Sequence, residues 1–146
     1  MKPSNFFTSE QKERIREAIR SAEKDTSGEI RVHIDKKCKG DPLDRAAYIF
    51  EKLTMHKTNL RNGVLFYLAT DDHKFAILGD AGINSIVQDN FWDHIKEVMA
   101  EKFREGDFTG GLETSILMAG EQLKKHFPYK IDDINELPDD ISFGEK

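Results

Sequence analysis

Apolar residues recur every three or four positions along four stretches of the chain, and this spacing predicts four amphipathic helices. The first begins after Thr8, because Thr8 and Gln11 match a capping box, and it stops near Gly28. The second begins at Asp41-Pro42, a pair typical of a helix start, and ends near His56. The last two are predicted over about residues 90–103 and 112–127.

Three further stretches have the patterns of β-strands. Glu29–Asp35 alternates between apolar and polar residues, which predicts a half-buried strand with His33 on its solvated face. Residues 64–69 are continuously apolar, as in a central strand that is covered on both faces. A polar turn at residues 71–73 leads into a returning strand at residues 74–78, so this pair is predicted to be a hairpin. The order of elements predicts an α/β fold, a three-layer α/β/α sandwich around a small mixed sheet of three to four strands.

The charge of the chain is divided unevenly. The 146 residues carry a net charge of -5, and residues 130–146 contribute six acids against two lysines, a net of −4. We therefore expect a single domain over residues 1–129 and an acidic C-terminal tail over residues 130–146. A nearly neutral domain lacks the basic face that a protein needs to neutralise nucleic-acid phosphates, so nucleic acid is not an expected partner.

The chain has one cysteine, Cys38, which excludes an intramolecular disulfide. Its N-terminus lacks the apolar core of a signal peptide, and its longest apolar run, residues 64–69, is far too short to span a bilayer. These features predict a cytoplasmic location and no membrane partner.

Acidic residues on glycine-containing loops are the main candidates for chemistry, because the sequence has no phosphate-binding glycine motif, zinc-protease motif or nucleophile elbow. Hard cations such as Ca²⁺ and Mg²⁺ bind carboxylate, amide and carbonyl oxygens, and glycine lets carbonyls turn toward an ion. The same residue types also form ordinary turns. The candidate metal ligands are Asp71, Asp72, Asp80, Asn84, Glu105 and Asp107.

A competing interpretation is an anion site at the start of the last helix. Gly110 and Gly111 precede free backbone N–H groups, which attract phosphate. Glu105 and Asp107 lie in the same loop and repel an anion, but a bridging divalent ion would reconcile the two, as in a metal-assisted phosphatase.

Four segments, in this order, resemble the TPM domain family: residues 23–32, the hairpin of residues 63–74, the glycine loop of residues 79–84, and residues 103–112. The resemblance covers about residues 8–127. It implies an α/β/α sandwich and divalent-metal binding, notably of calcium, by loops at one end of the sheet, and it points to the same six residues. The family includes a thylakoid lumen protein with acid phosphatase activity and membrane-tethered bacterial proteins. This chain resembles a stand-alone, soluble member.

Together these observations predict a divalent-metal-binding domain with a regulatory or structural role. One or two Ca²⁺ or Mg²⁺ ions are expected between the loops Gly79–Asn84 and Arg104–Gly111, at one end of the sheet. Two alternatives are a metal-assisted acid phosphatase and a protein-interaction module that uses the acidic tail. The sequence identifies no catalytic residue and no organic cofactor.

Overall fold

The computed structural model describes residues 1–129 and 140–144. Its strands form one sheet with the order β3-β2-β1-β4. The strands are β1 (Glu29–Asp35), β2 (Gly63–Ala69), β3 (Lys74–Gly79) and β4 (Ile141–Phe143). The helices are α1 (Pro3–Phe6), α2 (Ser9–Glu23), α3 (Pro42–Lys52), α4 (Ala81–Asn84), α5 (Asp93–Arg104) and α6 (Phe108–His126), with a 3₁₀ turn, η1 (Met55–Lys57).

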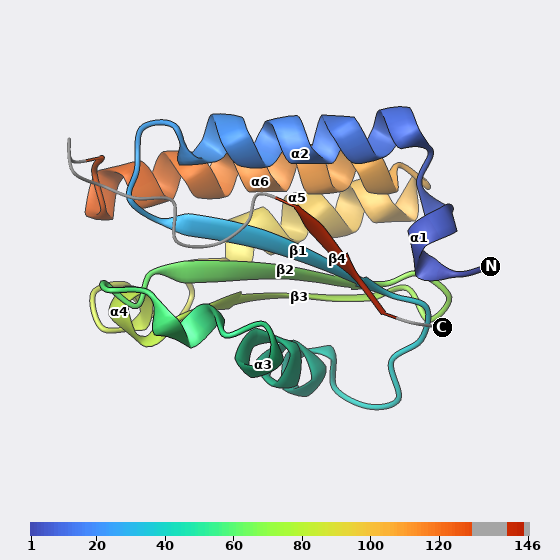
Figure 1. Cartoon of the computed structure of the whole chain (residues 1–146), viewed down its shortest axis with the longest axis horizontal. Coiled ribbons are helices and arrows are strands. Elements are labelled where there is room, and N and C mark those ends of the chain that lie inside the picture. Colours follow the sequence, from blue (N-terminus) through green and yellow to red (C-terminus); the bar gives the residue numbers. More distant parts are fainter. Residues whose placement is uncertain (130–139, 145–146) are drawn as a thin grey trace.

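The sheet is mixed and lies between two layers of helices. Strand β1 pairs in parallel with both β2 and β4, whereas β2 and β3 form an antiparallel hairpin. Helices α2, α5 and α6 cover one face, and α3 covers the other (Figure 1). The predicted α/β/α sandwich, the mixed sheet and the hairpin are therefore confirmed.

Two hydrophobic clusters separate the layers. The larger one fills the space between the sheet and α2, α5 and α6, where Ile30, Val32 and Ile34 of β1 are fully buried. The smaller one lies under α3 and contains Leu65 and Tyr67 of β2. Every residue of β2 is buried, as its continuous apolar pattern predicts, because both layers pack on this strand.

The helix ends follow local capping chemistry. Thr8 and Gln11 form the predicted capping box of α2, and the Asp41 side chain accepts a hydrogen bond from the Leu43 N–H at the start of α3. Helix α6 begins at Phe108, earlier than the predicted start near Leu112, because the Asp107 carboxylate caps the Gly110 N–H.

The glycines Gly110 and Gly111 are the reason why the sequence did not predict this earlier start of α6. Helices α5 and α6 approach so closely that a Cβ at Gly111 would lie 2.5 Å from a Phe103 ring carbon. The glycine pattern that indicated a break is therefore a requirement of helix packing. Helix α5 begins at Asp93, later than the predicted start near Asp89 or Asn90.

Part of the predicted tail belongs to the sheet. Residues 141–143 form β4, and Arg16 of α2 donates to Asp140 at 2.8 Å. A strand of three residues is too short for an alternating pattern to reveal it, so its pairing with β1 had no signal in the sequence. Residues 130–139 and 145–146, which include most of the predicted acidic tail, lie outside the described residues.

Among the helices of the described ranges, none combines the length and the apolar character that crossing a bilayer requires.

Candidate functional site

The predicted metal ligands do not converge on one site. Because β2 and β3 are antiparallel, the loop that follows β3 and the turn that joins the two strands emerge at opposite ends of the sheet. Asp80 and Asn84 lie at the end marked by α4 in Figure 1, whereas Asp71 and Asp72 lie in the turn at the other end. The contact of Phe108 with His73 places the loop Arg104–Gly111 at that other end as well. The expected site between the loops Gly79–Asn84 and Arg104–Gly111 is therefore wrong, because sequence spacing does not reveal at which end of the sheet a loop emerges.

At the α4 end, the carboxylate of Asp80 is already paired with an arginine. Asp80 is 6% exposed, and Arg61 donates to its two oxygens from Nε at 2.8 Å and from Nη2 at 2.9 Å. The same carboxylate caps α4 by accepting from the Ala81 N–H. The Asn84 amide donates to the Gly79 carbonyl at 3.0 Å. A cation at this end would have to displace Arg61.

At the opposite end, which we call the hairpin end, the β2–β3 turn lies beside the start of α6. The rings of His73 and Phe108 are 5.8 Å apart, centre to centre, so the turn that carries Asp71 and Asp72 lies near the start of α6. Asp72 accepts from the Cys38 N–H at 2.7 Å, and Asp107 accepts from the Gly110 N–H at 2.8 Å.

The remaining two acids of the hairpin end, Asp71 and Glu105, are exposed. Within residues 1–129 and 140–144, neither side chain has a hydrogen-bond or ion-pair partner. In the same part of the chain, no group of three or more His, Cys, Asp or Glu side chains is placed to hold a metal ion. The hairpin end thus offers oxygen donors of the right type, but they are not gathered around one point.

A buried polar network lies on the face of β1 that is turned toward α3, opposite to the larger hydrophobic cluster. His33 Nε2 contacts Asp35 Oδ1 at 2.9 Å, and His33 Nδ1 contacts the Ser142 hydroxyl at 2.9 Å. The second Asp35 oxygen accepts from Tyr67 Oη at 2.7 Å and from Arg45 Nε at 2.9 Å. The side chains of His33 and Asp35 are 5% and 6% exposed, so this network is largely removed from water.

Strand register explains why these side chains meet. Tyr67, His33 and Ser142 are direct neighbours across β2, β1 and β4, so their side chains project from the same face of the sheet. The rings of His33 and Tyr67 stack with their centres 6.1 Å apart. With Asp35 ionised, His33 Nε2 carries the hydrogen, and in the neutral ring Nδ1 then accepts from Ser142.

The network has electrostatic consequences. Burial alone would raise the pKa of Asp35, but the hydrogen bonds from His33, Arg45 and Tyr67 outweigh it and hold that pKa below its ordinary range. Burial raises the pKa of the Tyr67 hydroxyl, and the hydrogen bond to Asp35 raises it further. Asp35 therefore carries a negative charge, and Tyr67 stays protonated.

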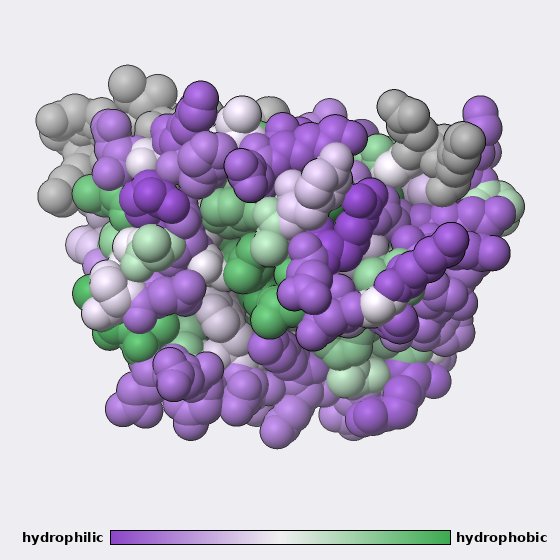
Figure 2. Space-filling view, turned by 90° about the horizontal axis from the view of Figure 1, so that it is seen from below, coloured by the Kyte–Doolittle hydropathy of each residue, from purple (hydrophilic) through white to green (hydrophobic). Residues whose placement is uncertain are grey.

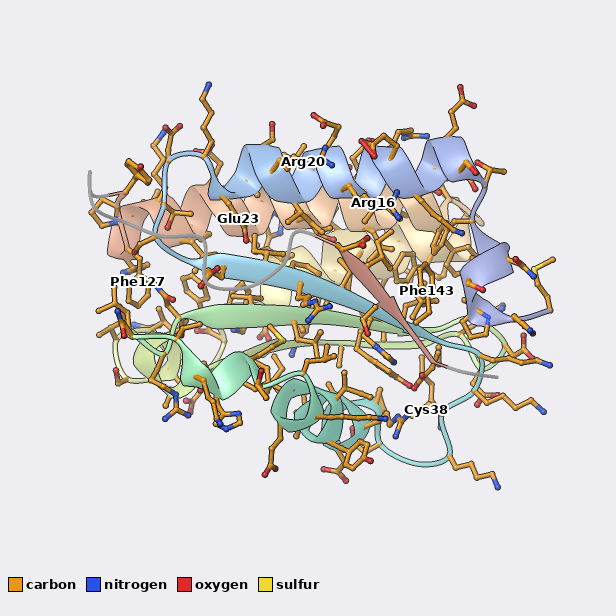
Figure 3. All side chains as sticks on the ribbon, in the orientation of Figure 1. Arg16, Arg20, Glu23, Cys38, Phe127 and Phe143 are labelled. Atoms are coloured by element: carbon orange, nitrogen blue, oxygen red, sulfur yellow. The ribbon has the colours of Figure 1, made fainter. Side chains whose placement is uncertain are left out.

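This network borders a cavity of about 600 Å³ between α3, the end of β1, and β4. The lining residues come from all three elements and the loop after β1: His33, Asp35, Lys36, Lys37, Arg45, Ile49, Lys52, Leu53, Ser142, Phe143 and Gly144. Figure 3 shows Phe143 on β4 and Cys38 in the β1–α3 loop, both toward the same end of the sheet. Gly144 passes so near Asp35 that a Cβ there would lie 2.3 Å from Oδ1.

Sequence reasoning missed this site. His33 was predicted to be solvated, but it is 4% exposed, because β1 is a central strand with β4 beside it and α3 nearby. The available signal was the polar row Glu29, Arg31, His33 and Asp35 on a strand whose other face is fully apolar. The partners Arg45, Tyr67 and Ser142 lie 10, 32 and 109 residues from their contacts, beyond any local pattern.

Comparison with known proteins identifies the family. The model of the TPM domain matches residues 1–122, so the chain belongs to the TPM domain family. None of the curated proteins matches the chain.

Solved structures agree with this assignment. The BA42 protein of the psychrophilic bacterium Bizionia argentinensis, determined by NMR, is 49% identical, with a TM-score of 0.90 over 96% of this chain and 97% of that one. The N-terminal domain of a P. gingivalis protein is 19% identical with a TM-score of 0.67, covering 85% of this chain and 80% of that one. The N-terminal domain of cg2496 from Corynebacterium glutamicum is 13% identical with a TM-score of 0.66, covering 98% and 84%. The last two show a shared fold alone.

Proposed function

We propose that this TPM domain binds a divalent cation, Ca²⁺ or Mg²⁺, at the hairpin end, with a structural or regulatory role. The observation that carries the proposal is the 5.8 Å contact between His73 and Phe108, which holds the acidic turn of the hairpin beside Asp107. An ion that binds the folded state would draw these loops together and stabilise the domain by mass action.

The donor chemistry of the hairpin end suits a hard cation. Asp71, Asp72, Glu105 and Asp107 supply only oxygens, and the surrounding turns supply backbone carbonyls. These acids are not preassembled around one point, so water must complete the coordination shell of the ion. We therefore expect a weak site, with a Kd on the order of 10⁻⁴–10⁻³ M. Asp80 and Asn84 are left out of the proposed site, because Arg61 neutralises Asp80.

Calorimetric titration of EDTA-stripped protein with CaCl₂ and MgCl₂ tests this proposal, together with amide NMR shifts that locate the ion. We expect saturable heat and shifts centred on residues 71–73 and 104–108. Asp107→Asn should weaken binding by about tenfold, because one charge is lost while asparagine still caps α6. Asp71→Asn should have a similar effect.

Asp44→Asn is the matched control, since Asp44 is an exposed acid on α3, across the sheet from α6. Its binding should equal that of the unaltered protein. The proposal is wrong if millimolar metal gives no heat above dilution, or if the shifts lie only around residues 79–85. The acid phosphatase stays a separate prediction, which requires metal-dependent hydrolysis of p-nitrophenyl phosphate that is lost in Asp107→Asn.

A further inference from the structure

The cavity between α3, β1 and β4 has a charge opposite to that of the protein as a whole. Among the residues that the structure describes, four cationic side chains line it, Lys36, Lys37, Arg45 and Lys52, against one acid, Asp35. The complete chain carries a net charge of -5. A cluster of one sign inside a concave site concentrates the field and attracts ligands of the opposite sign.

The single acid does not neutralise this cluster. The Asp35 carboxylate is already matched by Arg45 and by the hydrogen bonds from Tyr67 and His33. Lys36, Lys37 and Lys52 form no ion pair with any residue in the described part of the chain. The cavity therefore presents three uncompensated ammonium groups, together with a guanidinium whose orientation Asp35 holds.

Apolar side chains also line the cavity. Ile49 of α3 and Leu53, the residue that follows α3, line it together with Phe143 of β4. Viewed from the α3 side, the surface is mostly hydrophilic, with apolar residues showing between the charged ones (Figure 2). A volume of about 600 Å³ lies within the range of pockets that hold small molecules.

We propose that this cavity binds a small organic dianion, with a phosphate-type head on the cationic side and an apolar body against Ile49, Leu53 and Phe143. Three lysines and one arginine favour a doubly charged head over a single carboxylate. Arg45 is suited to the head group because its planar guanidinium presents five N–H donors, of which Nε is engaged by Asp35.

The site depends on the far C-terminal end of the chain. Ser142, Phe143 and Gly144 form one wall, and β4 is held at the sheet edge by pairing with β1 and by the Ser142–His33 contact. A ligand that touches this wall binds only the state in which β4 is docked. Ligand binding should therefore slow hydrogen exchange of the β4 amides.

A titration of metal-free protein with phenylphosphonate, followed by amide NMR in buffer passed over a chelating resin, tests the proposal. We expect saturable shifts at Lys36, Lys37, Arg45 and residues 142–144. Inorganic phosphate carries the head alone and should bind more weakly, and benzyl alcohol carries the neutral body and should give no saturable shift. Because divalent ions are removed beforehand, the result does not depend on the metal site proposed above.

Charge-removing variants provide the second arm of the test. Lys37→Gln and Lys52→Gln should each weaken phenylphosphonate binding about twofold to fivefold, and the double variant by about tenfold. Lys57→Gln is the matched control, because Lys57 is also exposed and does not line the cavity. The proposal is overturned if phenylphosphonate fails to saturate at its solubility limit. It is also overturned if benzyl alcohol shifts the same residues equally, or if Lys57→Gln weakens binding as much as the cavity variants.

Discussion

The two faces of β1 hold the domain together by different means, although they belong to one strand of seven residues. Toward α2 and α6, Ile30, Val32 and Ile34 are each 0% exposed and contribute by burial of apolar area. Toward α3, His33 and Asp35 contribute through hydrogen bonds whose partners come from three other elements. Burial is non-directional, whereas the polar face requires each partner at a defined position.

This difference shows where binding chemistry can be added to the fold. The apolar face is filled by packed side chains, so its contribution depends on volume and shape. The polar face already carries a fixed charge at Asp35 and oriented donors at Arg45 and Tyr67, and it borders a cavity.

Ile34→Ala tests the apolar face. The substitution leaves a void between β1 and the α2–α6 layer, and we expect the free energy of unfolding to fall by about 3 kcal/mol. Urea denaturation at neutral pH measures the change, and the slope with denaturant should be unaltered. Leu117→Ala is the control, since Leu117 on α6 is 41% exposed; its loss should stay within about 0.5 kcal/mol. Equal losses in the two variants would contradict the assignment of the core.

Asp35→Asn tests the polar face. An asparagine amide cannot serve as a charged acceptor for His33, Arg45 and Tyr67 together, and its N–H groups oppose the donors around it. We expect the free energy of unfolding to fall by about 2 kcal/mol, less than for Ile34→Ala, because Arg45 is 38% exposed and water can solvate it. Urea denaturation compares it with Asp44→Asn, which should lie within about 0.5 kcal/mol of the unaltered protein.

The difference in unfolding free energy between the unaltered protein and Asp35→Asn should depend on pH. Since the folded-state pKa of Asp35 lies below its unfolded value, its stabilising contribution is fully present above about pH 5 and declines as the pH falls through the unfolded pKa toward the folded one. The stability gap between the unaltered protein and Asp35→Asn should therefore narrow on acidification. A gap that is constant from neutral to acidic pH would show that the carboxylate charge is not the cause.

Ser142→Ala tests the link between the polar face and the sheet edge. His33 Nδ1 loses its partner, and we expect a loss of about 1 kcal/mol in unfolding free energy. Hydrogen exchange of the Ile141–Phe143 amides should also become faster, because β4 is an edge strand of three residues. Ser21→Ala on the exposed side of α2 is the control. Unchanged exchange in β4 would mean that backbone pairing alone holds the strand.

Much of the fold could be predicted from local patterns. The capping box at Thr8, the strand Glu29–Asp35 and the apolar run in β2 each depend on residues close in the sequence, and all three are confirmed. The alternation also predicted a half-buried strand, which is wrong, because both faces of β1 are covered. The early start of α6 was missed because Gly111 is required by the contact with Phe103, which no local pattern contains. Strand β4 was missed because it exists through its pairing with β1.

The two candidate sites also differ in how much of them the local sequence reveals. The sequence indicated the acids of the hairpin end, because turn residues are visible in any chain. It did not indicate that Asp80 forms an ion pair with Arg61 or that Asp80 lies at the other end of the sheet, since both facts depend on strand direction. The cavity had no signal in the sequence, because its walls come from α3, β1 and residues 142–144, which are far apart along the chain.

Local patterns in the sequence are enough to predict most helices and strands and their apolar faces, because these properties repeat over a few residues. The burial of His33, the alignment of Tyr67, His33 and Ser142 across three strands, and the grouping of four cations around one cavity arise only when the chain folds. The physical reason is that hydrogen bonds and charge clusters act between side chains that the chain brings together from distant positions, whereas hydrophobic periodicity is a property of each segment alone.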